Sequence, residues 1–210
     1  LGEDELGHNI QRLGYWPKYN QKSAISEKEW QELKVKALPI LRGPLFVGVK
    51  YGNDGANVAM SVAVKTLSGK IFVETLDCQS IRNGNQWLVN FFKEANIESV
   101  VIDGQSGQSI LTNEMKDFRL KAPVLPTVKE IINANASWEQ GIYQKNICHA
   151  GQPSLEKVVT NCDKRNIGTS GGFGYKSQFD DMDICLMDSA LLAHWACHNA
   201  KPKKKQQIRY

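Results

Sequence analysis

The sequence predicts an α/β domain in which a mixed sheet is flanked by helices. Three observations lead to this prediction. First, the middle of the chain carries three apolar runs separated by glycine-containing turns, which is the pattern of an antiparallel meander. Helical and strand-like segments then alternate, as they do where helices cover a sheet. Finally, 41% of the 210 residues are hydrophobic and 23% are charged, as in an ordinary globular domain.

Residues 1–43 are expected to form an arm or linker that precedes the main domain. Ser26 is followed by acidic residues, as the N-cap of a helix often is, so a short helix should begin there. Pro39 and the turn after it end this helix. The main domain is therefore predicted to cover residues 44–200, and residues 201–210 to form a basic tail.

The meander is predicted from runs that are apolar enough for buried strands. The three expected strands are Leu45–Tyr51, Asn57–Val64 and Lys70–Leu76. Asn53–Gly55 and Ser68–Gly69 supply the turns between them. Short turns of this kind join antiparallel neighbours, so the three strands should lie side by side in chain order.

The rest of the chain alternates between helical spacing and short apolar runs. The expected order is helix Gln86–Ala95, strand Ser99–Ile102, helix Ile110–Phe118, strand Ala122–Val128, helix Lys129–Gln144, a helix after Pro153, a loop or hairpin at the glycines of 168–174, and a final helix Asp180–Asn199. A three-strand meander followed by this alternation is the element order of a ribonuclease H-like core. No GxGxxG follows a strand and no GxxxxGK[ST] occurs, so dinucleotide binding and a P-loop ATPase are poorly supported.

Acidic residues mark the ends of two of these elements. Asp103 directly follows the strand at Ser99–Ile102, and Asp180, Asp181 and Asp183 stand at the front of the final helix. If the fold brings these ends together, a divalent cation is the usual reason to tolerate the repulsion, and Mg²⁺ and Mn²⁺ prefer carboxylate oxygen. The alternative is that the helix acids serve only to complement the helix dipole.

Other features exclude several classes of protein. No apolar stretch approaches the roughly 20 residues that span a membrane. The first residues lack the basic start and apolar core of a signal peptide, so a soluble, non-secreted protein is expected. Five cysteines without CxxC spacing fit reduced thiols. His194, Cys197 and His198 offer an alternative zinc site that lacks a clear fourth ligand.

The formal net charge of +4 conceals a concentration of positive charge at the end of the chain. Lys201–Arg209 carries five cations and no acid. Such a run attracts phosphate by counterion release, although many terminal basic runs are simply solvated. It therefore supports nucleic-acid binding only weakly.

Several short motifs follow one another in an informative order. They are Asn9–Trp16 with Ile25–Trp30, Val47–Asp54, Val101–Gly104, His149–Pro153 followed by Asn161, and Asp180–Asp183 leading to Ser189–Leu191. In this order and spacing the chain resembles, over nearly its whole length, the C-terminal nuclease domain of the large terminase subunit of tailed bacteriophages. The resemblance implies a ribonuclease H-like fold.

The resemblance also implies a function. It is that of a metal-dependent endonuclease, which uses Mg²⁺ or Mn²⁺ to hydrolyse phosphodiester bonds of concatemeric viral DNA during genome packaging. The implied partners are double-stranded DNA, a terminase ATPase domain, the small terminase subunit and the portal, in the host cytoplasm and without a membrane. Two alternatives remain open: another ribonuclease H-like DNA enzyme, such as a resolvase or transposase core, and a non-catalytic DNA-binding or assembly module with a degenerate metal site.

The candidate ligands follow from matching the acids to this family. Asp103 matches the acid at the end of the second acidic strand. On the final helix Asp181 is preferred, because the residues four and eight positions later are small, with Asp183 next and Asp180 third. Asp188 is expected to be a buried or interhelical hydrogen-bonding group. His149 is either structural or a proton-transfer or phosphate-binding residue.

Lys50 departs from the family pattern, which usually has an aspartate between Val49 and Tyr51. A charged lysine cannot bind a cation. Three explanations remain open: Asp54 supplies the missing carboxylate and is catalytic, Lys50 replaces one metal ion electrostatically, or the residue is an inactivating change. If the resemblance holds, Lys50 should point toward Asp103 and the front of the final helix, and its ammonium should pair with an acid there.

Overall fold

The computed structural model describes residues 22–202 of the chain. Its helices and strands are, in order, α3 (Glu27–Gln31), β1 (Leu41–Tyr51), β2 (Asn57–Thr66), β3 (Ile71–Ser80), the 3-10 helix η1 (Ile81–Asn83), α4 (Gln86–Glu94), β4 (Ile97–Asp103), α5 (Gln108–Asp117), α6 (Val128–Tyr143), β5 (Ile147–Cys148), α7 (Pro153–Val159), β6 (Cys162–Ile167), β7 (Gly172–Ser177) and α8 (Cys185–His198). Apart from Lys201 and Pro202, the predicted basic tail lies outside the described residues, as does the motif at Asn9–Trp16.

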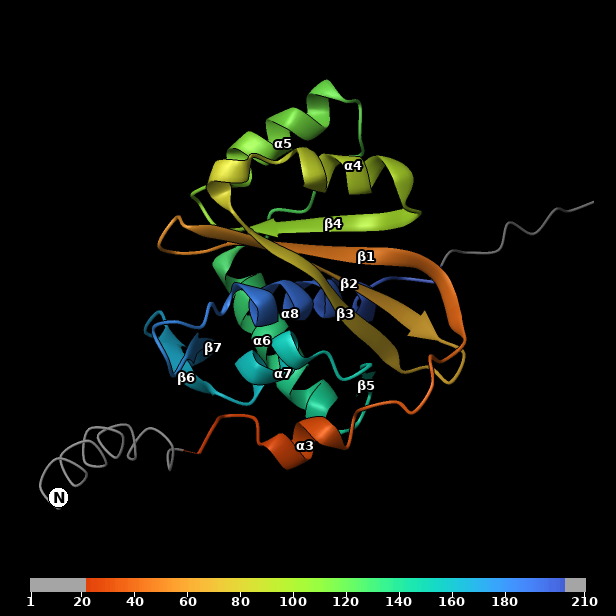
Figure 1. Cartoon of the computed structure of the whole chain (residues 1–210), viewed down its shortest axis with the longest axis vertical. Helices are drawn as coiled ribbons and strands as arrows, with labels where there is room; N and C mark the ends of the chain where they lie inside the picture. The colour runs from red at the N-terminus through yellow and green to blue at the C-terminus, as the bar shows by residue number, and fades with distance from the viewer. Residues whose placement is uncertain (1–21, 203–210) are drawn as a thin grey trace, which may run out of the picture.

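The main sheet has five strands in the order β4-β1-β2-β3-β5. β1, β2 and β3 form the predicted antiparallel meander, while β4 lies parallel to β1 and β5 lies parallel to β3. β6 and β7 form a separate hairpin, where a loop or hairpin was expected. The predicted mixed α/β architecture is therefore confirmed (Figure 1).

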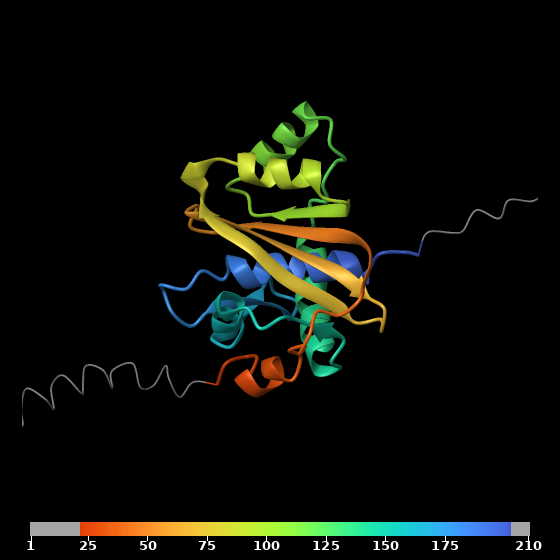
Figure 2. The same cartoon turned by 45° about the vertical axis from the view of Figure 1, so that its right-hand side comes forward.

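Helices cover both faces of the sheet. α8, α6 and α7 lie on one side, and α4 and α5 lie on the other, as the two views show (Figures 1 and 2). Alternation along β1 assigns its side chains to these layers: Val47 and Val49 pack with α4 and α5, whereas Phe46 packs with α8 and α6. Lys50 is four residues after Phe46 on the same strand, so its side chain also lies on the face covered by α8.

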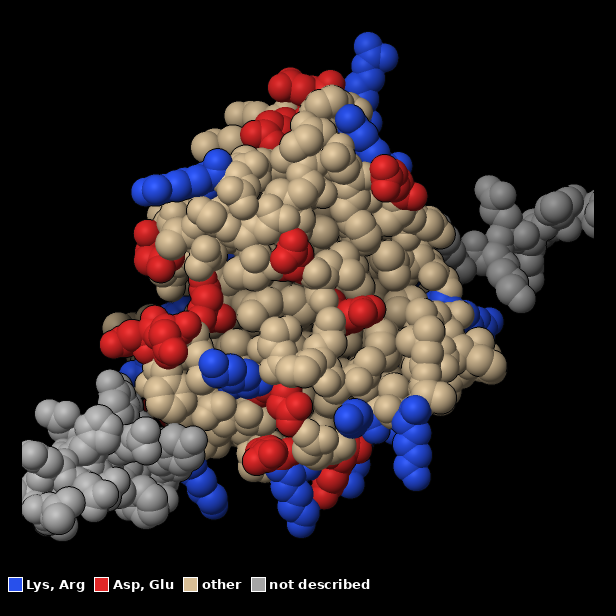
Figure 3. Space-filling view, viewed as in Figure 1, with Lys and Arg blue, Asp and Glu red and all other residues tan. Residues whose placement is uncertain are grey.

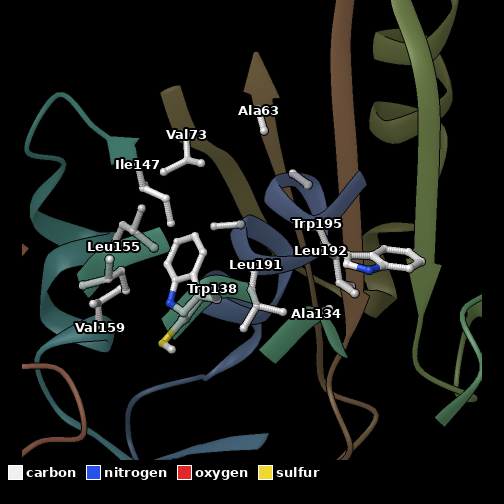
Figure 4. Packing of buried hydrophobic residues seen from close by; sticks show 14 of the residues in the cluster. Ala63, Val73, Ala134, Trp138, Ile147, Leu155, Val159, Leu191, Leu192 and Trp195 are labelled. Atoms are coloured by element: carbon white, nitrogen blue, oxygen red, sulfur yellow. The ribbon is translucent and has the colours of Figure 1, made fainter. Parts of the chain in front are cut away.

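The larger core surrounds Trp138 of α6. Its indole is fully buried among side chains from α7, α8 and the sheet, including Leu155, Leu191 and Ile147 (Figure 4). Trp30 and other residues that precede β1 belong to the same core cluster. The division at residue 43 stays a prediction about domain organisation, and the structure adds that residues 22–35 contribute to the core of the main domain.

The strand expected at Ala122–Val128 is wrong. Only Val124 forms a bridge there, parallel to Val101, and the fifth strand of the sheet is instead Ile147–Cys148. The reason is visible in the sequence: Pro123 and Pro126 flank Val124, and proline has no amide hydrogen to donate to a ladder.

The expected start of the final helix is also corrected. α8 begins at Cys185, so Asp180, Asp181 and Asp183 precede it rather than occupy its first turn. Asp183 Oδ1 accepts the amide hydrogen of Cys185, and Met182 donates to the carbonyl of Phe179 in a turn. These local bonds take the place of helical ones. Within residues 22–202 no helix is long and apolar enough to cross a membrane.

Candidate functional site

A cavity of about 110 Å³ lies where β1 and β4 end beside α8. Its polar lining consists of Lys50, Asp103, Asp188, Arg165 and Asn135. Apolar side chains of α6 and α8, together with Ile167 of β6 and Tyr175 of β7, complete the wall. The carboxyl ends of neighbouring parallel strands meet at one edge of a sheet, and such edges are frequent positions of binding sites in α/β folds.

Strand register brings the first two of these residues together. Lys50 of β1 and Asp103 of β4 are paired across the parallel strands. α8 then approaches β1 closely because Gly48 lacks a side chain: a Cβ atom there would lie 2.1 Å from the carbonyl oxygen of Ser189. Lys50, two residues further along the same face of β1, is thereby held against the N-terminal half of α8, which carries Asp188.

Lys50 and Asp103 form an ion pair inside the cavity. Their Nζ–Oδ2 distance is 2.5 Å, and Lys50 is only 7% exposed. Burial alone lowers the pKa of an ammonium, but the carboxylates of Asp188 and Asp103 outweigh it and raise the pKa of Lys50 above its ordinary value. The pairing expected for Lys50 is confirmed, and the side chain is a cation.

Asp188 is the site residue that the sequence reasoning missed. Burial raises its pKa to about 6, an effect that Lys50 and Arg165 oppose and that Asp103 increases. The expected burial agrees with this shift, and the structure adds that Asp188 lines the cavity. A usable signal was present: Asp188 is the only carboxylate of α8, a helix that is buried on nearly every side, and such groups seldom occur without a partner or a function.

Asp183 lies near this cavity but is engaged elsewhere. Its Oδ2 accepts a hydrogen bond from Asn57 Nδ2 at 2.9 Å, and its Oδ1 accepts one from the Cys185 amide at 2.9 Å. It therefore joins the start of β2 to the start of α8. Its carboxylate also contributes to the raised pKa of Asp188.

Asp54, Asp180 and Asp181 are exposed at the same end of the sheet. Asp54 Oδ1 accepts the amide hydrogen of Ala56 in the turn between β1 and β2, while Asp180 and Asp181 lie in the turn before α8. Figure 3 shows acidic side chains gathered along the left edge of this face, over that turn and the segment leading into α8. The roles proposed for Asp54, Asp181 and Asp183 stay predictions.

The donor set in the cavity decides what kind of metal site is compatible with it. Among residues 22–202, no three His, Cys, Asp or Glu side chains are grouped closely enough to hold a metal ion. Asp103 and Asp188 are nevertheless two carboxylates on one cavity, and Mg²⁺ is often held by one or two carboxylates with water and substrate phosphate completing its shell. The residues present fit one such ion but not a preformed two-ion centre.

His149 has a structural role. Its ring is stacked on Trp30, with centroids 4.0 Å apart. Nδ1 accepts the amide hydrogen of Gly151, so Nε2 carries the proton and donates it to the carbonyl of Trp30. Burial lowers the pKa of this histidine. With both nitrogens engaged, His149 ties the segment before β1 to the segment after β5.

The alternative zinc site at the end of α8 is wrong. His194 is buried and stacks on His198 with 5.7 Å between ring centroids, and burial lowers its pKa to about 3. Neither histidine belongs to a metal-binding group in the described part of the chain. All five cysteines are free thiols, as expected.

The five-stranded mixed sheet and its flanking helices are consistent with the ribonuclease H-like fold of terminase nuclease domains. No model of a known protein family matches the sequence, and no curated protein matches it either. Solved structures do match. The large terminase of bacteriophage HK97 aligns with 92% of this chain and 51% of its own, at 13% identity and a TM-score of 0.62.

Two isolated nuclease domains match with similar scores. The large terminase nuclease of the thermophilic phage G20c aligns with 83% of this chain and 98% of its own (15% identity, TM-score 0.56), and has also been solved with bound magnesium. A mutant nuclease domain of the large terminase subunit gp2 of bacterial virus Sf6, solved with manganese and beta-thujaplicinol, aligns with 81% of this chain and 97% of its own (11% identity, TM-score 0.57).

These matches confirm the resemblance at the level of the fold. The chain spans about half the length of the HK97 large terminase and nearly the whole length of the isolated nuclease domains. Because a fold can host several functions, activity must be argued from the cavity itself.

Proposed function

We propose that this chain is the nuclease domain of a phage large terminase and that it hydrolyses phosphodiester bonds of double-stranded, concatemeric viral DNA during genome packaging. The observation that carries the proposal is the convergence of Asp103 and Asp188 on one cavity, at the end of a sheet whose fold matches terminase nuclease domains. The same proposal places it in the host cytoplasm with an ATPase domain, the small terminase subunit and the portal as partners.

The proposed cofactor is Mg²⁺ or Mn²⁺, held by Asp103 and Asp188. Bound there, such an ion would supply polarisation of a phosphate oxygen and a more acidic water. Asp181, Asp183 and Asp54 remain proposed as additional acidic residues, since all three lie on segments at the same end of the sheet. For Asp183 to become a ligand, its bonds to Asn57 and Cys185 must be exchanged for bonds to the metal.

The chain's own cations have separate tasks in this proposal. Lys50 pairs with Asp103 and limits the repulsion between Asp103 and Asp188. Arg165 donates from Nε to the carbonyl of Tyr175, which fixes its guanidinium beside the cavity. The remaining guanidinium donors suit a DNA phosphate, which Arg binds through two parallel hydrogen bonds.

The ion pair of Lys50 favours a second candidate function. Because the ammonium already satisfies Asp103 at 2.5 Å, the same cavity suits a DNA-binding or assembly module that does not cleave. On this alternative the acids serve to bury Lys50 rather than to bind a metal.

Cleavage of supercoiled plasmid in Mn²⁺ or Mg²⁺ distinguishes the two functions. We expect metal-dependent nicking and linearisation by the wild-type chain, and a loss on the order of a hundredfold or more in Asp103→Asn and in Asp188→Asn. Asp117→Asn, an exposed acid on α5, is the matched control and should cleave normally. Duplex binding without cleavage at any metal concentration would select the non-catalytic module.

A further inference from the structure

A second positively charged site lies at the opposite end of β1 from the cavity. Arg42 and Lys65 are paired directly across β1 and β2, and Lys201 reaches the same place from the chain that follows α8. These cations border a groove of about 220 Å³, here called the basic groove. Its lining residues are Arg42, Pro44, Phe46, Lys65, Glu98, Ala200, Lys201 and Pro202.

The charge arrangement in the basic groove needs an explanation. Like charges directly opposite each other on antiparallel strands destabilise a sheet. The carbonyl end of α8 offsets part of this repulsion, and Glu98 supplies one carboxylate. Three cations against one carboxylate still leave two net positive charges beside an apolar floor formed by Pro44 and the buried Phe46.

The combination fits a sugar-phosphate backbone. Arg and Lys neutralise phosphates, and an apolar floor suits the deoxyribose that joins them. We propose that the basic groove binds the phosphate backbone of double-stranded DNA outside the candidate active site. This inference rests on the proposed function only in taking duplex DNA as the ligand.

Geometry separates this contact from any phosphate in the cavity. Arg42 and Lys50 are eight residues apart on one strand, which corresponds to about 26 Å. The cavity end of the sheet is edged by acidic side chains, which repel DNA unless cations intervene (Figure 3). A basic contact at the other end supplies affinity that the acidic end lacks.

The salt dependence of duplex binding tests the inference. The groove variant is Arg42→Gln/Lys65→Gln/Lys201→Gln in the full chain, and the control is Lys28→Gln/Lys116→Gln/Lys157→Gln, which removes the same charge from exposed positions elsewhere. Binding of a fluorescent 20-bp duplex is followed by anisotropy over a KCl series with EDTA present. Each lost phosphate contact should lower the slope of log K against log salt by about 0.9, so the groove variant should lose roughly 2 to 3 units and the control less than one.

Thermal unfolding at low salt checks that the variants are folded. The groove variant should melt at or above the wild-type temperature, because a like-charge pair is removed. If the triple variant does not fold, Arg42→Gln, Lys65→Gln and Lys201→Gln are tested one at a time, and each should lower the slope by about 0.9. An unchanged slope, or an equal loss in the control, would overturn the inference. Absence of duplex binding by the wild-type chain would overturn the proposed function as well, whereas wild-type binding with an unchanged groove-variant slope overturns this inference alone.

Discussion

Lys50 shares the cavity with two carboxylates, and its replacement gives the most direct test of how the cavity treats cations. Lys50→Asp removes the ammonium and adds a hard oxygen ligand beside Asp103. We expect Mn²⁺ binding at least about tenfold tighter than wild type, a gain on the order of 1.4 kcal/mol, measured by calorimetric titration. Nuclease activity should rise with it.

A neutral variant separates the two effects of that substitution. Lys50→Met removes the charge without adding a ligand, so its affinity for Mn²⁺ should lie between those of wild type and Lys50→Asp. Equal affinities in the Met and Asp variants would mean that an oxygen at position 50 does not reach the metal. Weaker binding by Lys50→Asp than by wild type would contradict the proposed site.

Asp188 predicts a pH dependence of stability with a definite sign. Its pKa is raised in the folded chain to about 6 from an ordinary value of 3.8. The stability that this group contributes is therefore fully present below about pH 4 and is lost as pH rises through about 6. Asp188→Asn cannot ionise, so its unfolding free energy should rise relative to that of wild type between about pH 4 and pH 6. At pH 8 the variant should be more stable than wild type by up to about 3 kcal/mol.

Urea unfolding of both proteins at pH 5 and pH 8 measures this difference. Asp117→Asn, at an exposed position, serves as the control and should track wild type at both pH values. A stability advantage of Asp188→Asn that shrinks as pH rises would show that the carboxylate is stabilised, not strained, by its surroundings.

Individual site residues were predictable to different degrees. Asp103 and Lys50 could be placed because both belong to short apolar strands whose direction and ends are evident in the sequence. Asp188 was separated from the acids before it, but as a buried hydrogen-bonding group rather than a site residue, because the final helix was expected to begin at Asp180. In the structure the Cys185 amide donates a hydrogen bond to Asp183 and α8 begins at Cys185, so Asp188 lies in the first turn of the helix and lines the cavity.

At the scale of elements, the approach of α8 to β1 depends on Gly48. A Cβ atom there would lie 2.1 Å from the Ser189 carbonyl oxygen and 2.6 Å from the Ala193 amide nitrogen, both backbone atoms of α8. Gly48→Ala must therefore displace the helix, and we expect a loss of about 2 to 4 kcal/mol in unfolding free energy. Gly43→Ala is the control. Gly43 has a φ of +90° and no atom within 4 Å of an added Cβ, so this substitution should cost only the backbone strain of about 1 kcal/mol.

Chemical denaturation of the two variants supplies the comparison. Gly48→Ala should also weaken duplex cleavage, since α8 carries Asp188. A Gly48→Ala protein as stable as Gly43→Ala would show that α8 can move away from β1 without loss.

The regular elements were largely predictable because their patterns are local. The meander could be recognised from apolar runs suited to buried strands and from glycine-containing turns, and α6 from its sequence over sixteen residues. The failures occurred where tertiary contacts decide the structure. β5 has only two residues, and it becomes a strand because β3 lies beside it, which no local pattern indicates.

At the scale of the whole molecule, the segment before β1 is part of the fold. Trp30 is fully buried, stacks on His149 and contacts Trp138 with 5.9 Å between ring centroids. Trp30→Ala should cost about 3 to 5 kcal/mol, measured by thermal or denaturant unfolding. Trp87→Ala, where the indole is only partly buried, is the comparison and should cost clearly less. A cost for Trp30→Ala no larger than that for Trp87→Ala would contradict the expected weight of Trp30 in the core.

The stack of Trp30 on His149 also has a mechanical consequence. A pulling force applied to the segment before β1 acts on an anchored chain, because Trp30 is buried in the core and its carbonyl accepts a hydrogen bond from His149 Nε2. The force is transmitted from Trp30 to His149, which directly follows β5, and from β5 to its neighbour β3 in the sheet that carries the cavity. A force applied to the segment before β1 would therefore act on the sheet that carries the candidate site.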